Sequence, residues 1–424
     1  MSFSFVIVGS NKRFKPCSVR VRAFSLLKNR GTLYTKCLRY FHIGSVIHSA
    51  SIKELEINIQ TDIPGPKSTK LRNDLLEYQQ ISSVSLISDS HKSLGNFLVD
   101  VDNNTYLDCF MQISSIPLGY NNPELIAALS TPANIHQLVN RPAMGWFPNE
   151  EWIEYITKVF MAVAPSGMDQ IFPMMCGTCS NENAMKLCFM KHMSKERGGR
   201  TEFTEEELNS TMANSPPGSP SLSILSFKGG FHGRTVGLLK DKRCLENLEE
   251  TIHTQNKLSA PIAGIIVEPI QSEGGDYHGS KSFFQGVDHI AHKYGISLII
   301  DEVQTHGPDI VTFSKKMLSG GIYHKKSHRP EHPGRVINTW LGDPHKVIML
   351  SEVWKYIQKH QCLKLAQDSG EVMLNGLKEL EKKFLGIIRS SRGIGTFCAF
   401  DCDSVQTRDK LIQKMLKKYY REQP

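Results

Sequence analysis

Three short runs of continuously apolar residues are the clearest pattern in the chain, at residues 222–227, 264–267 and 296–300. A strand that is apolar on both faces is typical of a parallel sheet covered by helices on both sides. Residues 283–292 lie between two of these runs and have the composition of a helix. The pattern therefore predicts an α/β sheet with helices on both faces, and ligands of such sheets bind at the carboxyl ends of the strands.

Other local patterns predict a hairpin, two helices and a surface loop. Residues 95–120 begin with alternating apolar and polar positions and carry a turn signal at Asp102, which predicts a short hairpin. Helix-capping and helix-forming residues predict a helix from about Ser180. Residues 200–220 are polar and contain three prolines, which indicates a surface loop around a short helix at 204–208.

The length of 424 residues fits one large core and a smaller domain. No apolar run reaches the roughly 18 residues that a membrane-spanning helix needs, so the sequence predicts no membrane association. The ten cysteines are scattered along the chain. They lack the dense spacing of a secreted disulfide scaffold and suit a reducing compartment.

The formal net charge of +8 is concentrated at the N-terminus. Residues 1–50 hold nine Lys or Arg and no Asp or Glu, which leaves 41 basic against 42 acidic residues in the remainder. A nearly neutral remainder argues against a nucleic-acid surface. An Arg-rich, acid-free leader is typical of a mitochondrial transit peptide and predicts a mitochondrial matrix protein. A secretory signal is the weaker alternative, because the basic residues follow the apolar run at 3–8 instead of preceding it.

A lysine doublet, Lys315 and Lys316, follows shortly after an apolar strand that Asp301 closes. A lysine at a strand end in an apolar setting can hold its amine partly unprotonated and form a Schiff base with a carbonyl. An acid at the end of another strand can hold a pyridinium nitrogen protonated. Pyridoxal phosphate needs these two contributions from a protein. On these residues alone, a solvated Ser-Lys-Lys turn is the commoner interpretation.

Eight short segments, in their order along the chain, resemble the class III aminotransferases, which are fold-type I pyridoxal phosphate enzymes. Several are typical of the branch that acts on 4-aminobutyrate and distinguish it from its ornithine and lysine relatives. The resemblance extends from about Pro64 to Asp401. The segments are residues 95–102, 112–120, 176–183, 231–235, 267–276, 301–304, 312–316 and 338–344.

The resemblance implies a reaction and an architecture. The ω-amino group of 4-aminobutyrate, β-alanine or 3-aminoisobutyrate would pass to 2-oxoglutarate, giving glutamate and, from 4-aminobutyrate, succinate semialdehyde. The protein would be a homodimer with small amino and keto acids as its partners. A large domain at residues 151–345 would contain a mostly parallel, seven-stranded type of sheet. A leader at 1–50 would precede an N-terminal segment with part of a small α+β domain at 51–150, and residues 346–424 would form the rest of that domain, which is truncated here.

The resemblance also assigns the cofactor site. Asp301 would contact the pyridine nitrogen, and Gln304 the phenolic oxygen. Composition cannot decide between the two lysines, but the family motif puts the Schiff base on Lys315 and leaves Lys316 solvated. The remaining cofactor contacts would be Gly177 and Thr178 at a helix N-terminus for the phosphate, Phe231 and His232 around the ring, and Thr339 from the neighbouring subunit.

Arg234 matches the residue that binds the substrate carboxylate, a role that suits its fork of donors. The resemblance adds Glu268, Glu273 and Ile113 to the substrate site.

Cys176 and Cys179 form a Cys-x-x-Cys pair. By resemblance, two such pairs would hold a [2Fe–2S] cluster across the dimer interface, since such clusters usually take four thiolates. Two reduced thiols beside a phosphate loop are the plainer alternative, and a redox pair is a third.

The chain departs from the family pattern in three places. Only residues 302–309 separate two strands that we expect to be parallel neighbours, which usually need a crossover of about a dozen residues. A loop segment is absent after Leu239. The chain ends in a basic helix at residues 408–421, without the arginine that pairs with Glu273 in the family. We therefore expect slow transamination, and an impaired or inactive variant that keeps the fold and dimer surface is the alternative.

Overall fold

A computed structural model describes residues 55–141, 143–235, 248–257, 260–301 and 308–421, together with the backbone of Ser18–Val19. The rest of the leader, Gln304 and the segment after Leu239 lie outside the described residues. The chain divides into two compact units, one formed by Ile135–Ser351 and the other by Met1–Asn134 with Glu352–Pro424.

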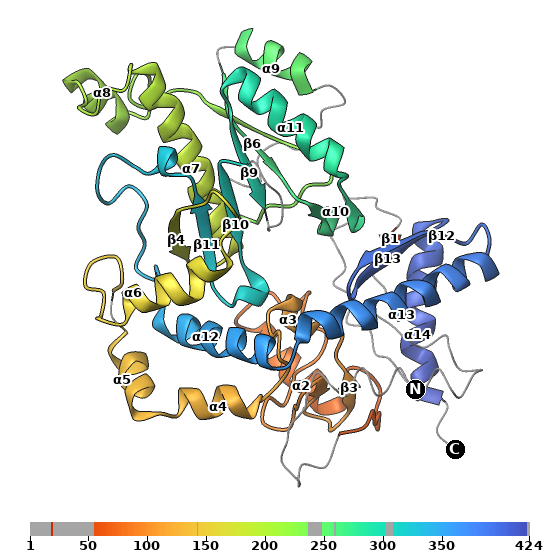
Figure 1. The fold of residues 1–424 in the computed structure, drawn as a ribbon. Helices are drawn as coiled ribbons and strands as arrows, with labels where there is room; N and C mark the ends of the chain where they lie inside the picture. Colours follow the sequence, from red (N-terminus) through yellow and green to blue (C-terminus); the bar gives the residue numbers. More distant parts are fainter. Residues whose placement is uncertain are drawn as a thin grey trace. The chain divides into compact units, whose positions relative to one another are not determined.

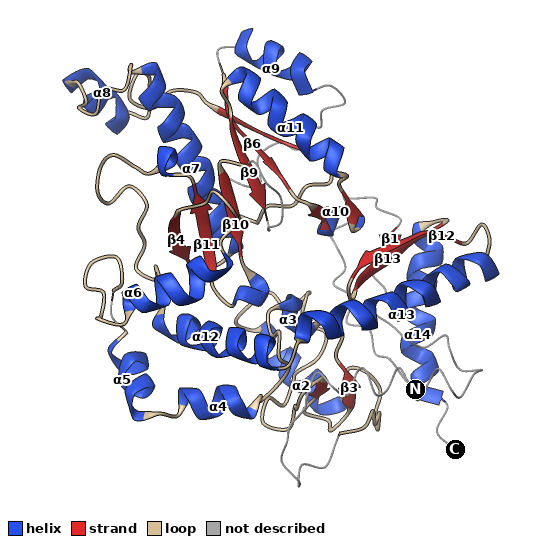
Figure 2. Cartoon of the chain, in the orientation of Figure 1, coloured by secondary structure: helices blue, strands red, loops and turns tan. Residues whose placement is uncertain are grey.

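The unit Ile135–Ser351 is built on a six-stranded, mostly parallel sheet (Figures 1 and 2). Among its described strands, β11 alone runs antiparallel to its neighbours. The three predicted apolar strands are confirmed as β5, β6 and β9, while a seventh strand is not found in the described part of the chain. In spatial order the strands are β4 (Gln170–Met174), β11 (Gly320–His324), β10 (Ile310–Phe313), β9 (Ser297–Asp301), β6 (Ile262–Val267) and β5 (Ser223–Ser226).

Alternate residues of the central strands pack into two separate apolar cores. Successive side chains of a strand point to opposite faces, so a strand that is buried on both faces contributes to both cores. In β9, Leu298 and Ile300 belong to one core, whereas Ile299 belongs to the other. The first core includes side chains of α9 (Leu248–Lys257), α11 (Lys281–Tyr294) and α12 (Pro344–Lys359), and the second those of α7 (Gly177–Glu196). Helices therefore cover both faces, as the apolar runs predict.

The helix expected from about Ser180 begins three residues earlier, at Gly177. Its N-cap is Cys176, whose extended backbone precedes the first turn without a side-chain capping bond. The polar residues that suggested a later start lie inside the helix, and the Ser180 hydroxyl donates to the carbonyl of Cys176. The shift in start moves Gly177 and Thr178 from a preceding loop into the first turn.

Strands β9 and β10 are parallel neighbours although only residues 302–309 connect them in sequence. Thr312 of β10 lies opposite Asp301 of β9. Asp309, just before β10, exchanges hydrogen bonds with Leu298: its backbone nitrogen donates to the Leu298 carbonyl (3.0 Å), and its carboxylate accepts from the Leu298 nitrogen (3.1 Å). The expectation that parallel pairing needs a longer connection is therefore wrong for these two strands.

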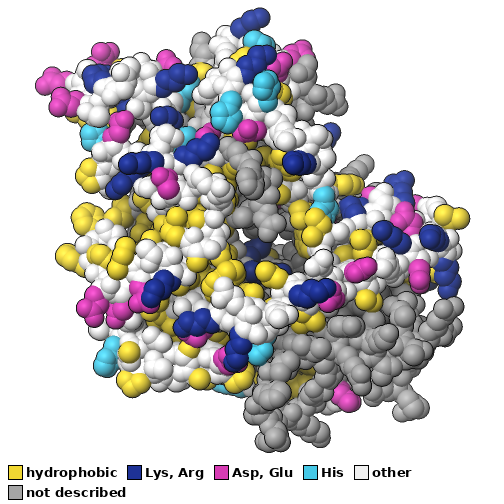
Figure 3. All heavy atoms as spheres, viewed as in Figure 1, with side chains coloured by type: hydrophobic (Ala, Val, Ile, Leu, Met, Phe, Trp, Pro, Cys, Tyr) yellow, Lys and Arg dark blue, Asp and Glu magenta, His cyan; other side chains and the backbone are white. Residues whose placement is uncertain are grey.

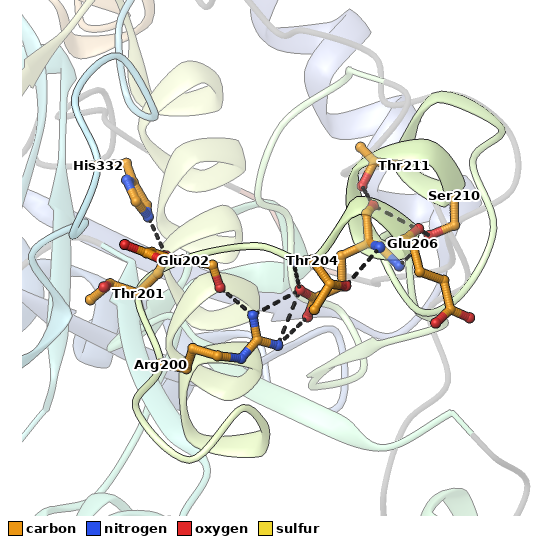
Figure 4. A network of polar contacts seen from close by, with 10 residues as sticks. Arg200, Thr201, Glu202, Thr204, Glu206, Ser210, Thr211 and His332 are labelled. Carbon is orange, nitrogen blue, oxygen red and sulfur yellow. Dashed lines mark hydrogen bonds and ion pairs between the residues drawn. The ribbon is translucent and has the colours of Figure 1, made fainter.

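The predicted surface loop at 200–220 is confirmed, and its short helix is α8 (Glu205–Met212). A capping box joins Thr204 and Glu207 at its N-terminus. The Arg200 guanidinium binds the Glu207 carboxylate at 3.0 Å and contacts the carbonyl of Glu202, so the loop folds back on the helix start (Figure 4). This arginine holds the pKa of Glu207 below its usual range.

The second unit contains the predicted hairpin, β2 (Phe97–Val99) and β3 (Thr105–Leu107). Asp100, fully buried at the turn, accepts hydrogen bonds from the Asn104 side chain (2.8 Å) and the Tyr106 hydroxyl (2.6 Å). Asp102 accepts from the backbone nitrogens of Lys67 and Ser68 in the first turn of α2 (Pro66–Leu76) at 2.8 Å each. One turn thus stabilises the hairpin and caps a helix.

The same unit holds a three-stranded antiparallel sheet, in which β13 lies between β1 and β12 and α13 packs on β12 and β13. The basic helix predicted at the C-terminal end is confirmed as α14. No helix among the described residues is long and apolar enough to cross a bilayer. The bounds here are β1 (Ser18–Val19), β12 (Ile388–Ile394), β13 (Phe397–Cys402), α13 (Cys362–Lys383) and α14 (Val405–Arg421).

Shorter elements complete the described chain. They are α3 (Met111–Ser114), α4 (Pro123–Leu129), α5 (Pro132–Asn140), α6 (Trp152–Tyr155), η2 (Ile156–Phe160), η3 (Met161–Val163), β7 (Ile270–Gln271), α10 (Ser272–Gly275), β8 (Tyr277–His278), η4 (Lys315–Met317) and η5 (Lys326–His328).

A buried histidine at the amino end of β9 makes stability depend on pH. The Nε2 atom of His328 lies 2.9 Å from the Ser297 hydroxyl, and burial lowers the pKa of His328 from 6.5 to about 4 against the opposing attraction of Asp309. Between these two values the unfolded chain binds a proton that the folded chain does not. The free energy of unfolding should therefore fall as the pH drops from about 6.5 to 4, by at most about 3.5 kcal/mol, since one pKa unit is about 1.4 kcal/mol.

Urea unfolding at several pH values measures this effect. The His328→Gln variant should lose this part of the pH dependence, whereas His289→Gln, a change at an exposed histidine of α11, should keep it. Equal pH profiles for the wild type and His328→Gln would contradict the assignment.

Candidate active site

Several predicted site residues lie at one edge of the sheet, where its parallel strands end. Asp301 is the last residue of β9, Glu268 follows β6 directly, and Lys315 lies two residues after β10. Gly177 follows β4, and β4 runs in the same direction as β10 because both are antiparallel to β11. The sheet topology thus gathers an acid, an amine and a helix N-terminus at the edge where ligands of such sheets bind.

Asp301 is the centre of a buried polar network. Its side chain is 10% exposed, and its Oδ2 atom accepts hydrogen bonds from Asn181 Nδ2 and His232 Nδ1, each at 2.8 Å. The Thr312 hydroxyl lies 3.3 Å from Asp301 Oδ1 and donates to Asn181 Oδ1 at 2.6 Å. A buried carboxylate is stable only with such donors or a cation.

The hydrogen-bond pattern determines which histidine nitrogen carries a proton. A carboxylate only accepts, so His232 donates through Nδ1 and its neutral form has a bare Nε2. That Nε2 atom is buried without a hydrogen-bond partner.

Lys315 lies in the loop that connects β10 to the antiparallel β11. Its backbone is left-handed (φ 53°), an uncommon conformation for a lysine, and strain of this kind is concentrated at functional sites. The strands on either side of the loop are packed together: the ring centres of Phe313 in β10 and Tyr323 in β11 lie 4.8 Å apart, and the Tyr323 hydroxyl donates to the carbonyl of Phe160. The side chain of Lys315 is exposed.

The first turn of α7 approaches the neighbouring loops very closely. A Cβ atom on Gly177 would lie 3.1 Å from the Cβ of Ser314, which directly precedes Lys315. A Cβ atom on Gly320 would lie 2.5–2.8 Å from the backbone of Cys176. Glycine at both positions therefore lets the first turn of α7 come close to the lysine loop. Amides at a helix N-terminus are suited to bind an anion.

The segment after β5 contributes its backbone as well as its side chains. The Phe231 nitrogen donates to the Glu268 carboxylate at 2.9 Å, which fixes this segment to the end of β6. The Arg234 guanidinium lies 5.3 Å from the centre of the Phe231 ring and is exposed. Glu273 belongs to α10, but its side chain lies outside the described residues.

Three other predicted residues are not brought to this edge by any described contact. Thr339 is exposed, and Gln304 lies outside the described residues. Ile113 belongs to the other compact unit, where its side chain is 63% exposed.

The segment that carries Ile113 is a turn of left-handed helix. Four successive residues, Met111 to Ser114, have φ between 50° and 61°, at a cost of roughly 1–2 kcal/mol for each residue. Asp108 accepts hydrogen bonds from the nitrogens of Phe110 and Met111 and from the Tyr120 hydroxyl. This network stabilises a backbone that the sequence did not predict.

The two cysteines differ in their surroundings. Cys176 is exposed, whereas Cys179 is half-buried with its sulfur 3.7 Å from the Met174 sulfur. Burial raises the pKa of the Cys179 thiol. Both are free, and the described residues contain no group of three or more potential metal ligands. The described residues of one chain therefore supply, at this site, two of the four thiolates that an iron–sulfur cluster usually takes.

The donor set fits pyridoxal phosphate. Among the described residues, Asp301 Oδ1 has only the long 3.3 Å contact with Thr312, so it can accept a hydrogen bond from a protonated ring nitrogen. The α7 N-terminus supplies free amides for a phosphate, and Lys315 supplies an amine. Sequence reasoning missed Asn181 and Thr312, although a threonine within the apolar strand β10 is a signal for a polar contact.

The fold and this site define a class of protein, and comparison with known families agrees. The family model of class-III aminotransferases matches residues 78–241 and 238–419, so the chain belongs to this family of pyridoxal phosphate-dependent transaminases. The two matched segments meet near Leu239, where the sequence suggests a missing loop.

Three curated relatives within this family share one named activity. The chain is 41% identical to the mitochondrial 4-aminobutyrate aminotransferases of Sus scrofa and Homo sapiens over 84% of its own length and 82% of theirs. The 4-aminobutyrate aminotransferase of Dictyostelium discoideum is 40% identical over the same shares.

A solved structure shares the fold. Lysine aminotransferase from M. tuberculosis has a TM-score of 0.68 at 21% identity, covering 83% of this chain and 91% of that one. At this identity the likeness shows the fold alone.

Gly320→Ala should disrupt the approach of α7 to the lysine loop. The new Cβ would meet backbone atoms of Cys176, which cannot rotate away, so we expect a loss of roughly 1–3 kcal/mol in the free energy of unfolding and weaker binding of pyridoxal phosphate. Urea unfolding and cofactor titration measure both effects.

Gly286→Ala is the matched control, because no atom lies within 4 Å of its added Cβ on α11. Alanine should be neutral or stabilise the helix by up to about 1 kcal/mol. If both variants behaved like the wild type, the close approach at Gly320 would be of no importance.

Proposed function

We propose that this chain is a 4-aminobutyrate aminotransferase, which transfers the ω-amino group of 4-aminobutyrate to 2-oxoglutarate. The identity of about 41% to curated enzymes of that name, over most of both chains, carries the proposal. The acid, amine and helix N-terminus at one sheet edge support it chemically.

In this proposal Asp301 binds the pyridine nitrogen of pyridoxal phosphate, and the amides of Gly177 and Thr178 bind its phosphate. Phe231 stacks on the ring, His232 orients Asp301, and Gln304 binds the phenolic oxygen. The cofactor, when bound, withdraws electrons from the carbon that loses a proton. Lys315 holds the cofactor through its Nζ atom, and the same atom accepts that proton once the substrate amine has replaced it.

The proposed substrate contacts include one positively charged side chain and two acidic ones. Arg234 binds the carboxylate of 4-aminobutyrate, for which its exposed, forked guanidinium is suited. Glu268 and Glu273 line the same pocket. The Phe231–Glu268 hydrogen bond supports this grouping, because it holds the segment that carries Arg234 beside Glu268.

We further propose a homodimer in which Thr339 of each subunit reaches the phosphate of the other. Support comes from exposed apolar side chains in α5, in and just before α6, after β4 and next to Thr339; Figure 3 shows apolar surface around α6. These exposed side chains are Val139, Trp146, Phe147, Ile153, Met175 and Trp340.

Two finer points belong to the same proposal. Cys176 and Cys179 of both subunits together would supply the four thiolates that a [2Fe–2S] cluster needs. The mitochondrial location of the relatives, with the acid-free basic leader, favours a matrix enzyme.

Borohydride reduction of the cofactor-bound protein tests the roles of the lysines. Peptide mapping should find the label on Lys315, and Lys315→Ala should lose both the label and the formation of succinate semialdehyde from 4-aminobutyrate. Lys316→Ala is the matched control and should keep both. A label on Lys316 would reject the assignment.

The same assay tests the substrate. 4-Aminobutyrate should react faster than ornithine or lysine when each is supplied with 2-oxoglutarate. A preference for ornithine or lysine would place the chain in another branch of the family.

The leader gives a separate prediction. A fusion of residues 1–50 to a fluorescent protein should enter mitochondria, because these fifty residues contain nine basic residues and no acidic ones. A fusion in which these basic residues are replaced by glutamine is the control and should stay outside. Cytosolic fluorescence of the unchanged fusion would exclude this role.

A further inference from the structure

We propose that Asn181 and Thr312 are positioning residues, which hold the Asp301 carboxylate so that its Oδ1 atom is left for the cationic ring nitrogen of the cofactor. The inference deepens the proposed function and rests on it for the identity of the cofactor. It gives a role to two buried polar residues, Asn181 and Thr312, that are hydrogen-bonded to each other and to Asp301.

Asn181 uses both of its amide hydrogens. Its Nδ2 atom donates to Asp301 Oδ2 and to the backbone carbonyl of His232, each at 2.8 Å. The residue is 2% exposed, so water does not compete for these bonds. With the His232 imidazole also donating to Oδ2, one oxygen of Asp301 receives two strong hydrogen bonds.

Thr312 fixes the direction of that amide. Its hydroxyl has one hydrogen, which goes to Asn181 Oδ1 at 2.6 Å rather than to Asp301 Oδ1 at 3.3 Å. A flipped amide would turn its oxygen toward the Asp301 carboxylate and the His232 carbonyl and lose both hydrogen bonds that Nδ2 donates, while the Thr312 hydroxyl could then only accept from it. The Thr312 donor therefore supports the orientation in which Nδ2 faces Oδ2, and it leaves Asp301 Oδ1 as an acceptor.

The network also connects the two ends of the cofactor site. Asn181 lies four residues after Gly177, which is about one turn of α7, so both residues lie on one side of the helix. Thr312 lies opposite Asp301 in the register of β10 and β9. One rigid helix turn thus sets the distance between the phosphate site and the carboxylate.

A network of this kind could instead serve stability alone, so the test needs a readout that stability does not move. Thr312→Val keeps the shape of the side chain but removes the donor to Asn181 Oδ1, which loosens the position of the amide beside Asp301. Thr312→Ser restores the hydroxyl. Ser297→Ala is the matched control, because it removes a buried hydroxyl from the opposite end of β9, far along the strand from Asp301.

The first readout is the protein with pyridoxal phosphate bound. Thr312→Val should weaken cofactor binding by about tenfold, the change that corresponds to about 1.4 kcal/mol, and should raise the pH midpoint of the visible absorption band. The midpoint rises because a less firmly protonated ring nitrogen withdraws fewer electrons. Thr312→Ser should resemble the wild type, and Ser297→Ala should lower the melting temperature without moving the midpoint.

The second readout needs no cofactor. In the protein with labelled histidine, the Nδ1 proton that His232 donates to Asp301 should give a downfield resonance, which Thr312→Val should shift or broaden and Thr312→Ser should keep. If Thr312→Val lowers only the melting temperature and leaves the absorption midpoint and this resonance unchanged, the positioning role is wrong. Failure of the wild type to bind pyridoxal phosphate would instead reject the proposed function.

Discussion

The buried carboxylate of Asp301 is the constraint on which the active-site edge depends. A carboxylate at the end of an apolar strand must be paired, and leaving it without a donor costs several kcal/mol. Its donors come from separate parts of the chain: Asn181 from α7 and His232 from the segment after β5. The requirement to satisfy one charge therefore aligns a helix and a loop with the end of β9. Gly177, which is proposed to bind the phosphate, lies one helical turn before Asn181 in α7. Phe231, which is proposed to stack on the ring, directly precedes His232.

Close packing of backbone segments is the second constraint on the active-site edge of the sheet. Gly320 of β11 faces the backbone of Cys176, and Gly321 faces the ring of Phe313, where an added Cβ would lie 2.1 Å away. The contact at Gly320 brings β11 against the backbone of Cys176 at the start of α7, and the contact at Gly321 packs β11 against Phe313 of β10. The lysine loop and the phosphate site are thus positioned by main-chain packing, whereas the ring nitrogen would be recognised through side chains. Substitutions at the close-packed glycines should therefore change mainly the free energy of unfolding. Substitutions at the side chains around Asp301 should change mainly how this carboxylate binds a charged ring nitrogen.

The sequence predicted the parts of this arrangement that are local. Apolar runs indicated β5, β6 and β9, and the change from apolar residues to Asp301 marked the strand end. Asn181 and Thr312 could not be found in this way, because their contacts join residues 131 and 120 positions apart and no local pattern encodes them. The left-handed turn at Ile113 was missed for a related reason, since no glycine marks it and the distant Tyr120–Asp108 contact supports it. The start of α7 was misplaced because Cys176 is an unusual N-cap.

The short connection between β9 and β10 shows how the register at the site is set. A crossover helix usually brings a chain back to the start of the next parallel strand. Here Asp309 sets the start of β10 instead, because it pairs with Leu298 through two hydrogen bonds and its Oδ1 atom binds Lys325 at 2.9 Å. With Asp309 fixed beside Leu298, β10 continues in step with β9 and Thr312 arrives opposite Asp301. A slip of one residue would turn Thr312 to the other face of the sheet and remove it from Asn181. The network around the Asp301 carboxylate is therefore secured by an ion pair at the opposite end of the strands.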